Sequence, residues 1–254
     1  HIDELAGILQ KYMIRRLKKD VLKELPDKSY TDIQVDMSKE TKVSYDVALN
    51  DLMTFLMDYA EYDEEKAENA LRAETLVRIN KLKSLVINDK IKVLNELIES
   101  NGKFVVFCDF MEPLAKLKEH YGDSAVLHTG RQSTQERQDA VDRFQNDPDV
   151  KVFLAGTQAS KTVITLTASS HVAFISYPWT PGDYDQATDR CHRMGQKDNV
   201  SVYNLSCGEI DDKILETINT KRVLIAQLMS GERKSMSGAG SILGDVVSKI
   251  KGGY

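Results

Sequence analysis

Two arginines three residues apart, Arg190 and Arg193, are the side chains of this sequence best suited to act on a substrate. The surrounding pattern predicts a helix over residues 184–194, and a helix places positions i and i+3 on one face. Arginine is always charged, and its planar fork matches phosphate oxygens. The pair therefore predicts a site where negative charge develops on a transferred phosphoryl group. A solvated, charged helix face is the alternative that charge alone leaves open.

The elements expected to position these arginines alternate between strands and helices. Strand-length apolar runs occupy residues 104–108, 125–128, 150–155, 172–177 and 200–205, and helical patterns between them occupy 111–121, 133–146 and 184–194. Such alternation indicates an α/β fold, a doubly wound parallel sheet covered on both faces. Ligands bind at the carboxyl ends of its strands, which here lead into loops at 109–113, 129–133, 156–161 and 178–183.

The flanking regions are predicted to be mainly helical. Residues 1–25 carry an apolar stripe at helical spacing, Leu5, Ile8, Leu9, Tyr12 and Met13, and Pro26 ends this helix. Residues 30–37 are partly strand-like, and helices follow over 38–60, with Ser38 as N-cap, over 64–87 and over 90–100. A closing helix begins near Ile210. We therefore expect a lead-in segment and helical appendage over 1–100, the α/β lobe over 101–230, and a mobile tail over 231–254.

The amino-acid composition limits which classes of protein this chain can belong to. The 254 residues are 29% charged with a net charge of −5, which is unusual for a free-standing nucleic-acid binder, although a local basic face can still bind nucleic acid. Its three cysteines fit neither a zinc pattern nor a disulfide framework, which indicates a reducing compartment. The densest basic run comprises Lys11, Arg15, Arg16, Lys18, Lys19 and Lys23.

The sequence has no apolar run of membrane-spanning length and no signal-peptide pattern. We therefore expect an intracellular, monomeric protein, in the nucleus if eukaryotic and in the cytoplasm or nucleoid if microbial or viral. Because the chain begins at His1, it is expected to be a fragment of a longer protein.

The segment from Gln186 to Gln196 has the pattern Q-x-x-D-R-x-H-R-x-G-Q. This pattern resembles the last helicase motif of the Swi/Snf-like (sucrose non-fermenting) helicase-like family, which are superfamily-two DNA translocases. Weaker matches follow the family's order between residues 10 and 230, at Arg15–Val21, Leu25–Lys28, Phe104–Phe110, Gly130, Glu136–Arg137, Phe144 and Tyr177–Pro181. The family hydrolyses ATP between two lobes, so the resemblance implies a RecA-like fold.

In that family the first lobe carries a P-loop, G-x-x-x-x-G-K-[ST], and an acidic pair that holds magnesium, and this sequence has neither. The stretch Gly156–Thr162 ends in Lys-Thr, but Ser160 replaces the second glycine of the loop whose backbone amides cradle phosphate. The resemblance therefore implies the second, C-terminal motor lobe alone. ATP and its magnesium belong on the absent first lobe, and no metal ligand is expected on this chain.

The resemblance also implies roles for the arginine motif. Arg193 is the expected arginine finger, stabilising negative charge on the γ-phosphoryl group across the cleft, and Arg190 is its partner on phosphate or on cleft-lining carboxylates. Gln186 is expected to orient the nucleotide or the opposing lobe. Asp189 completes the expected nucleotide-binding set and, with His192, is expected to fix the arginine rotamers.

Double-stranded DNA is expected to be held through its phosphates by amides and hydroxyls of the strand-end loops. Ordinary turn chemistry is the alternative for each candidate. The candidates are Thr129, Gly130, Ser133, Thr157 and Lys161.

The chain departs from the family pattern at residues 158–163. The family usually has an arginine followed by Ala-Gly-Gly at 158–161, where this chain has Gln-Ala-Ser-Lys, and Val163 replaces a usual glycine. Thr129 also stands where an aspartate is common. These features are closer to the annealing-helicase branch, or to a divergent microbial or viral member, than to nucleosome remodellers. They also leave open a non-catalytic module for DNA or partner binding. The missing Gly-rich loop argues against an unrelated doubly wound nucleotide-binding enzyme.

Overall fold

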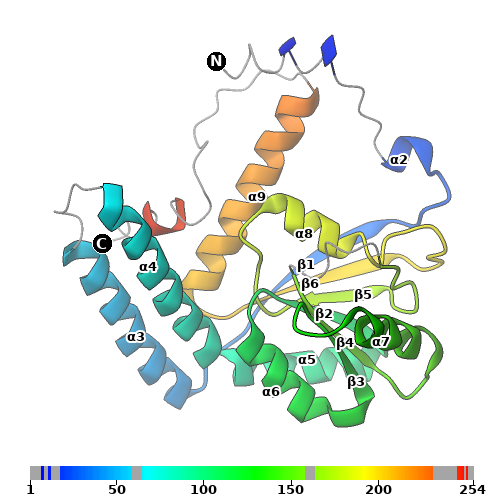
Figure 1. Cartoon of the computed structure of the whole chain (residues 1–254), viewed down its shortest axis with the longest axis horizontal. Helices are drawn as coiled ribbons and strands as arrows, with labels where there is room; N and C mark the ends of the chain where they lie inside the picture. The colour runs from blue at the N-terminus through cyan, green and yellow to red at the C-terminus, as the bar shows by residue number, and fades with distance from the viewer. Residues whose placement is uncertain are drawn as a thin grey trace.

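The structure, a computed structural model, describes residues 7–8, 11–12, 18–58, 65–157, 164–230, 245–248 and 250 (Figure 1). Within these residues six parallel strands form one sheet in the order β1-β6-β5-β2-β4-β3. The strands are β1 (Lys28–Gln34), β2 (Phe104–Cys108), β3 (Ala125–His128), β4 (Val152–Gly156), β5 (His171–Phe174) and β6 (Val200–Ser206). The predicted doubly wound parallel sheet is confirmed.

The central strands are buried on both faces, as their continuous apolar sequences require. Every residue of β2 is buried, and so is every residue of β4 except Gly156. Removing one large apolar side chain such as Phe104 or Phe153 from water contributes roughly 1.5–3 kcal/mol, and both are fully buried. This central core holds the carboxyl ends of the strands, where the candidate site lies, in fixed positions.

Between the strands lie α6 (Met111–Tyr121), the short 3-10 helix η2 (Gly122–Ser124), α7 (Thr134–Asn146) and α8 (Pro181–Thr188), and α9 (Glu209–Ser230) follows the last strand. Apart from η2, which was not predicted, these helices match the predicted ranges with one exception. Ser133 caps α7 by accepting a hydrogen bond from the Glu136 amide, and the Glu136 carboxylate accepts one from the Ser133 amide. The exception is α8, which ends before both arginines.

The N-terminal third adds helices and an edge strand. The helices are α2 (Lys18–Val21), α3 (Lys39–Asp58), α4 (Glu65–Leu85) and α5 (Ile87–Asn101), and α3 and α4 lie side by side (Figure 1). Ser38 caps α3, as predicted, through the Thr41 amide at 3.2 Å. Strand β1 pairs with β6 in the same sheet as the lobe, while the proposed boundary at residue 100 stays a prediction.

The helix predicted over residues 1–25 falls largely outside the described residues. Leu5, Leu9 and Met13 are among the residues that the structure does not describe, whereas Ile8 and Tyr12 are exposed. In the described part of the chain, no helix has both the length and the apolar character needed to cross a membrane.

The helical appendage is joined to the sheet by two buried ion pairs. Lys90 of α5 contacts Asp211 of α9 at 2.5 Å, and Lys83 of α4 contacts Asp109, directly after β2, at 2.9 Å. All four side chains are at most 6% exposed. Breaking such a pair from one side leaves an unpaired buried charge, so these contacts fix the appendage against the strand ends.

Part of the range predicted to be a mobile tail packs against the core. Residues 245–248 are helical, and Val246 and Ile250 are buried with the hydrophobic core. Asp245 forms an ion pair with Lys221 of α9 at 2.7 Å. This C-terminal segment (residues 245–248 and 250) therefore contacts α9.

Replacing Gly208 by alanine should destabilise the protein by at least about 2 kcal/mol. Gly208 joins β6 to α9 with φ +87°, and an added Cβ would lie 2.7 Å from Cζ of Tyr45 and also strike Met37 Cε. Gly102→Ala is the matched control, because Gly102 has φ +88° but no heavy atom within 4 Å of an added Cβ. Urea unfolding of both variants measures the difference. Equal losses of unfolding free energy would show that Tyr45 and Met37 move aside freely.

Candidate functional site

Arg190 and Arg193 lie in consecutive turns after α8 and not on a helix. Thr180 caps α8, Pro181 begins it, and it ends at Thr188. The backbone then tightens, because the Arg190 amide bonds to the Ala187 carbonyl three residues back. The predicted helix over 184–194 is therefore wrong, and the argument from one helical face does not apply. We call residues 189–196 the arginine turn.

The positive charges and hydrogen-bond donors of the two guanidinium groups in the turn are only partly matched by partners. Arg193 Nη1 donates to the Ile164 carbonyl at 3.3 Å, a neutral acceptor. Arg190 Nε is buried and has no hydrogen-bond partner among the described residues. Partial burial, and after it the charge of Arg193, lower the pKa of Arg190. An anion is the partner that two neighbouring cations in this state would gain most from binding.

The arginine turn is tied to the segment that leads into β1, which we call the lead-in segment (residues 18–28). Asp189 accepts hydrogen bonds from Lys18 at 2.6 Å and from Lys28 at 2.9 Å. Burial alone would raise the pKa of Asp189, but the two lysines outweigh it and the pKa lies below its ordinary value. His192 Nε2 donates to the Pro26 carbonyl at 2.7 Å. Asp189 and His192 thus hold the backbone of the turn, whereas the sequence predicted that they hold the arginine side chains.

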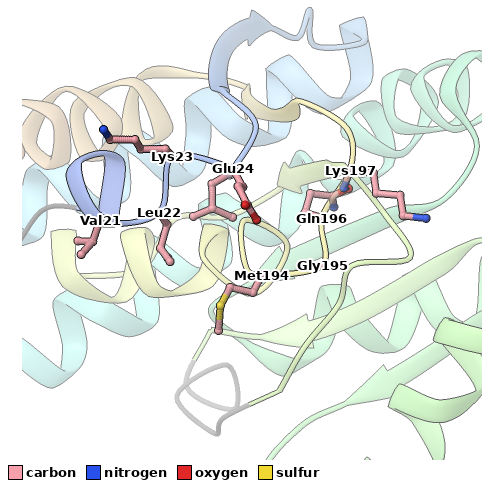
Figure 2. A pocket seen from close by; sticks show the side chains of 9 residues that line it. Val21, Leu22, Lys23, Glu24, Met194, Gly195, Gln196 and Lys197 are labelled. Carbon is pink, nitrogen blue, oxygen red and sulfur yellow. The ribbon is translucent and has the colours of Figure 1, made fainter.

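A pocket of about 650 Å³ separates the lead-in segment from the end of the arginine turn. Figure 2 shows its two walls, residues 21–25 on one side and 194–197 on the other. The buried Gln196 supports the second wall by donating to the Ser169 carbonyl at 2.9 Å. Gly195, with φ +99°, lies in this turn and not at the predicted helix C-terminus. The pocket places open space directly beside the arginine turn.

The DNA candidates gather at the carboxyl ends of β3 and β4. These strands are paired, with His128 opposite Ala155, so Thr129 and Thr157 follow neighbouring strand ends. Both threonines are 1% exposed, whereas Gly130 and Ser133 are open to solvent. The Ser133 hydroxyl serves as the cap of α7. Lys161 lies outside the described residues.

Gln186 is exposed on α8, one turn before the arginine turn, so it faces solvent and not the core. Among the described residues, no group of three or more His, Cys, Asp or Glu side chains could hold a metal ion. The residues that sequence reasoning missed are Lys28 and Pro26, whose partners lie more than 160 residues away. Their only signal was the match of Leu25–Lys28 to the family pattern.

An all-parallel, doubly wound sheet with an arginine pair in the turns after α8 has the architecture of a RecA-like lobe, and the sequence matches that of a helicase C-terminal lobe. The chain is similar to the Swi/Snf-like family of these proteins along most of its length. A family model described as "Helicase conserved C-terminal domain" matches residues 89–195, and one described as "SNF2-related domain" matches residues 1–91.

Curated relatives show the same similarity. The chain is 29% identical over 248 residues to the DNA annealing helicase and endonuclease ZRANB3 of Mus musculus, covering 93% of this chain and 22% of that protein. It is 29% identical over 236 residues to an uncharacterized ATP-dependent helicase of Mycoplasma genitalium, covering 86% and 22%. The chain therefore spans about a fifth of the length of these relatives. They represent the annealing-helicase and microbial branches that the residues suggested.

Two solved structures share the fold. The C-terminal part of the Fun30 ATPase domain superposes with a TM-score of 0.64 at 16% identity, covering 89% of this chain and 97% of that one. The Sulfolobus solfataricus SWI2/SNF2 ATPase core in complex with dsDNA gives 0.61 at 24% identity, covering 91% and 52%.

Proposed function

We propose that this chain is the C-terminal motor lobe of an ATP-dependent double-stranded DNA translocase. Its proposed partners are duplex DNA and a first RecA-like lobe of the same full-length protein, which works as a monomer. The observation that carries the proposal is the arginine turn, in which Arg190 Nε is buried without a described partner beside Arg193.

Nucleotide is proposed to be held by the other lobe, because the natural ligand position of this sheet is filled by its own side chains. The chain leaves β2 toward β3 and leaves β5 toward β6, so the strand order reverses between the adjacent strands β2 and β5. Ligands of doubly wound sheets bind at such a point. Here Asp109 binds both Lys83 and Ser176, and Lys83 also lies 4.6 Å from the ring of Trp179. This cluster supports a lobe that completes a nucleotide site without holding the nucleotide alone.

Arg193 is the proposed arginine finger. Its contact with the neutral carbonyl of Ile164 orients the guanidinium without cancelling its charge, so the group can stabilise negative charge on a phosphoryl group in transfer. Arg190 binds phosphate beside it, Gln186 completes the nucleotide-facing set, and Asp189 positions the arginine turn through its two lysines. Magnesium would be held by ligands on the first lobe and would supply positive charge that neutralises the phosphates of bound ATP.

DNA is proposed to bind through phosphates at the ends of β3 and β4. Gly130 and Ser133 are open to solvent there, while Thr129, Thr157 and Lys161 complete the set. At the start of the loop from β4 to β5, the Thr157 amide donates a hydrogen bond to the Cys108 carbonyl. Toward the end of this loop, the Leu166 amide donates one to the Arg190 carbonyl. One loop therefore contacts both the DNA edge and the arginine turn, which supports coupling of the two ligands.

ATP hydrolysis by the full-length protein, with and without duplex DNA, tests the proposal. We expect duplex DNA to stimulate turnover, and we expect this chain alone to show none because half of the site is missing. Denatured DNA of the same sequence is the control for duplex specificity. Turnover by the isolated chain, or turnover of the full-length protein that DNA leaves unchanged, would contradict the proposal.

The alternative is a divergent lobe that binds DNA or a partner without motor function. The substitutions at 158–163 favour it, since bulkier residues alter how closely a phosphate can approach. This module would show sequence-independent, salt-sensitive DNA binding together with ATP binding that DNA never converts into hydrolysis.

A further inference from the structure

The lead-in segment contacts the arginine turn through two of its lysines, Lys18 and Lys28. Lys28 Nζ binds Asp189 Oδ1 at 2.9 Å and Thr188 Oγ1 at 3.1 Å. Lys18 Nζ binds Asp189 Oδ2 at 2.6 Å and approaches the His192 carbonyl at 3.5 Å. The two carboxylate oxygens of Asp189 are therefore each held by a different lysine.

Asp189 is the carboxylate best placed to neutralise Arg190. It precedes Arg190 in the sequence, and its negative charge acts on that guanidinium, although less than burial and Arg193 do. Both side chains are only partly exposed, so an ion pair between them would be weakly screened by solvent. In the structure Asp189 makes no such pair. Its oxygens point to the lysines, and Arg190 Nε is left without a partner among the described residues.

We infer that Lys28, assisted by Lys18, is a positioning residue that keeps Asp189 away from Arg190 and so leaves Arg190 available to phosphate. The effect of this role on catalysis rests on the proposed function. The competition between the two lysines and Arg190 for the Asp189 carboxylate does not. If one of the lysines is removed, the Asp189 oxygen that it held gains most by accepting from the adjacent guanidinium. The lead-in segment would then act on the reaction by setting the charge of the arginine turn.

A competing explanation is that Lys28 only stabilises the fold. The chain contains a matched ion pair that separates the two explanations. Lys221 and Asp245 are 2.7 Å apart with side-chain exposures of 13% and 31%, against 2.9 Å, 16% and 32% for Lys28 and Asp189. The Lys221 pair joins α9 to the C-terminal segment. Lys221→Met therefore removes an ion pair of similar burial that lies outside the arginine turn.

The first test uses this chain alone and follows the arginine Nε–H signals by NMR, with Arg190→Lys assigning the signal of Arg190. In Lys28→Met we expect the Arg190 signal to shift and to exchange more slowly with water, because Asp189 now accepts from it. Adding Asp189→Asn should reverse the shift, and Lys221→Met should leave the signal in place. An unchanged Arg190 signal in folded Lys28→Met would overturn the inference.

Lys18→Met provides a second variant should Lys28→Met fail to fold. Lys18 is 45% exposed, so its loss costs little folding free energy while freeing one oxygen of Asp189. A smaller shift of the Arg190 signal in the same direction is expected. No shift would overturn the inference equally.

The second test measures DNA-stimulated ATP hydrolysis by the full-length protein. We expect Lys28→Met to lower kcat about tenfold with KM for ATP changed less than about twofold. Lys28→Arg should retain activity, and Asp189→Asn should restore the Lys28→Met variant at least in part. A loss of kcat that Asp189→Asn does not relieve would assign Lys28 a purely structural role. If the unaltered protein shows no DNA-stimulated turnover, the proposed function fails, while the NMR test still decides whether Lys28 controls the pairing of Asp189.

Discussion

Replacing Arg193 by alanine should lower DNA-stimulated ATP hydrolysis about a thousandfold, the effect expected for loss of an arginine finger. The side chain is oriented by the Ile164 carbonyl at 3.3 Å, and it has no ion-pair partner within the described residues. Its interaction with phosphate is proposed to form mainly in the transition state, so kcat should fall while the affinity for ATP stays close to that of the unaltered protein. Steady-state hydrolysis at saturating ATP and duplex DNA measures the loss.

Arg78→Ala is the control for removing an arginine of similar burial. Arg78 contacts Asp51 across the α3–α4 pair and lies over the ring of Phe55, away from the arginine turn in the fold. We expect hydrolysis within about twofold of the unaltered protein. An Arg193→Ala variant that stays folded and keeps more than about a tenth of the activity would exclude the finger role, since that role carries a larger share of the rate.

The identity of the two arginines could be predicted from the sequence, but their geometry could not. The predicted helix over 184–194 assumed that an uninterrupted helical pattern continues to Gly195. Instead α8 ends at Thr188, where Thr188 and Asp189 bond to Lys28, which lies 160 and 161 positions away from them. Contacts at such separation leave no periodic signal in the local sequence, so the end of α8 depended on information that the local pattern does not contain.

The strands were predictable for a related reason. A strand buried on both faces must be apolar at every position, and β2 and β4 fulfil this locally. Strand β1 has an exposed pattern with one partly buried apolar residue, Ile33, so its sequence predicts a strand without indicating a partner. Its pairing with β6 joins residues about 170 positions apart. The α/β class therefore followed from the sequence, whereas the position of β1 at the edge of the sheet beside β6 did not.

The strand-end loops show how far the DNA candidates could be predicted. Topology alone places the residues after β3 and β4 on one edge of the sheet, and the structure gathers Thr129, Gly130, Ser133 and Thr157 there. The local sequence predicts the role of some of these residues but not of others. Ser133 completes a capping box with Glu136, which the spacing of the two residues already suggests. The burial of both threonines depends on packing across the sheet and has no such signature.

Lys90→Met should reduce the free energy of unfolding by about 3–5 kcal/mol, because it leaves a buried carboxylate unpaired. Lys90 Nζ contacts Asp211 at 2.5 Å and donates to the Ile175 carbonyl at 2.6 Å. Lys90 is 1% exposed and Asp211 2%. Burial removes water from both charged groups, which is unfavourable in free energy, and their pairing offsets this loss. Urea unfolding followed by circular dichroism measures the change.

Two further variants show that the loss comes from the unpaired charge. Lys42→Met removes an exposed pair with Asp46, at 67% and 53% exposure, and should change the free energy of unfolding by less than about 1 kcal/mol. Adding Asp211→Asn to Lys90→Met removes the buried charge while keeping an acceptor for the Cys207 amide, which Asp211 binds at 3.1 Å, so much of the stability should return. If Lys90→Met behaves like Lys42→Met, the pair does not hold α5 to α9. In that case the Ile175 carbonyl, which precedes the loop leading to α8 and the arginine turn, would need another support.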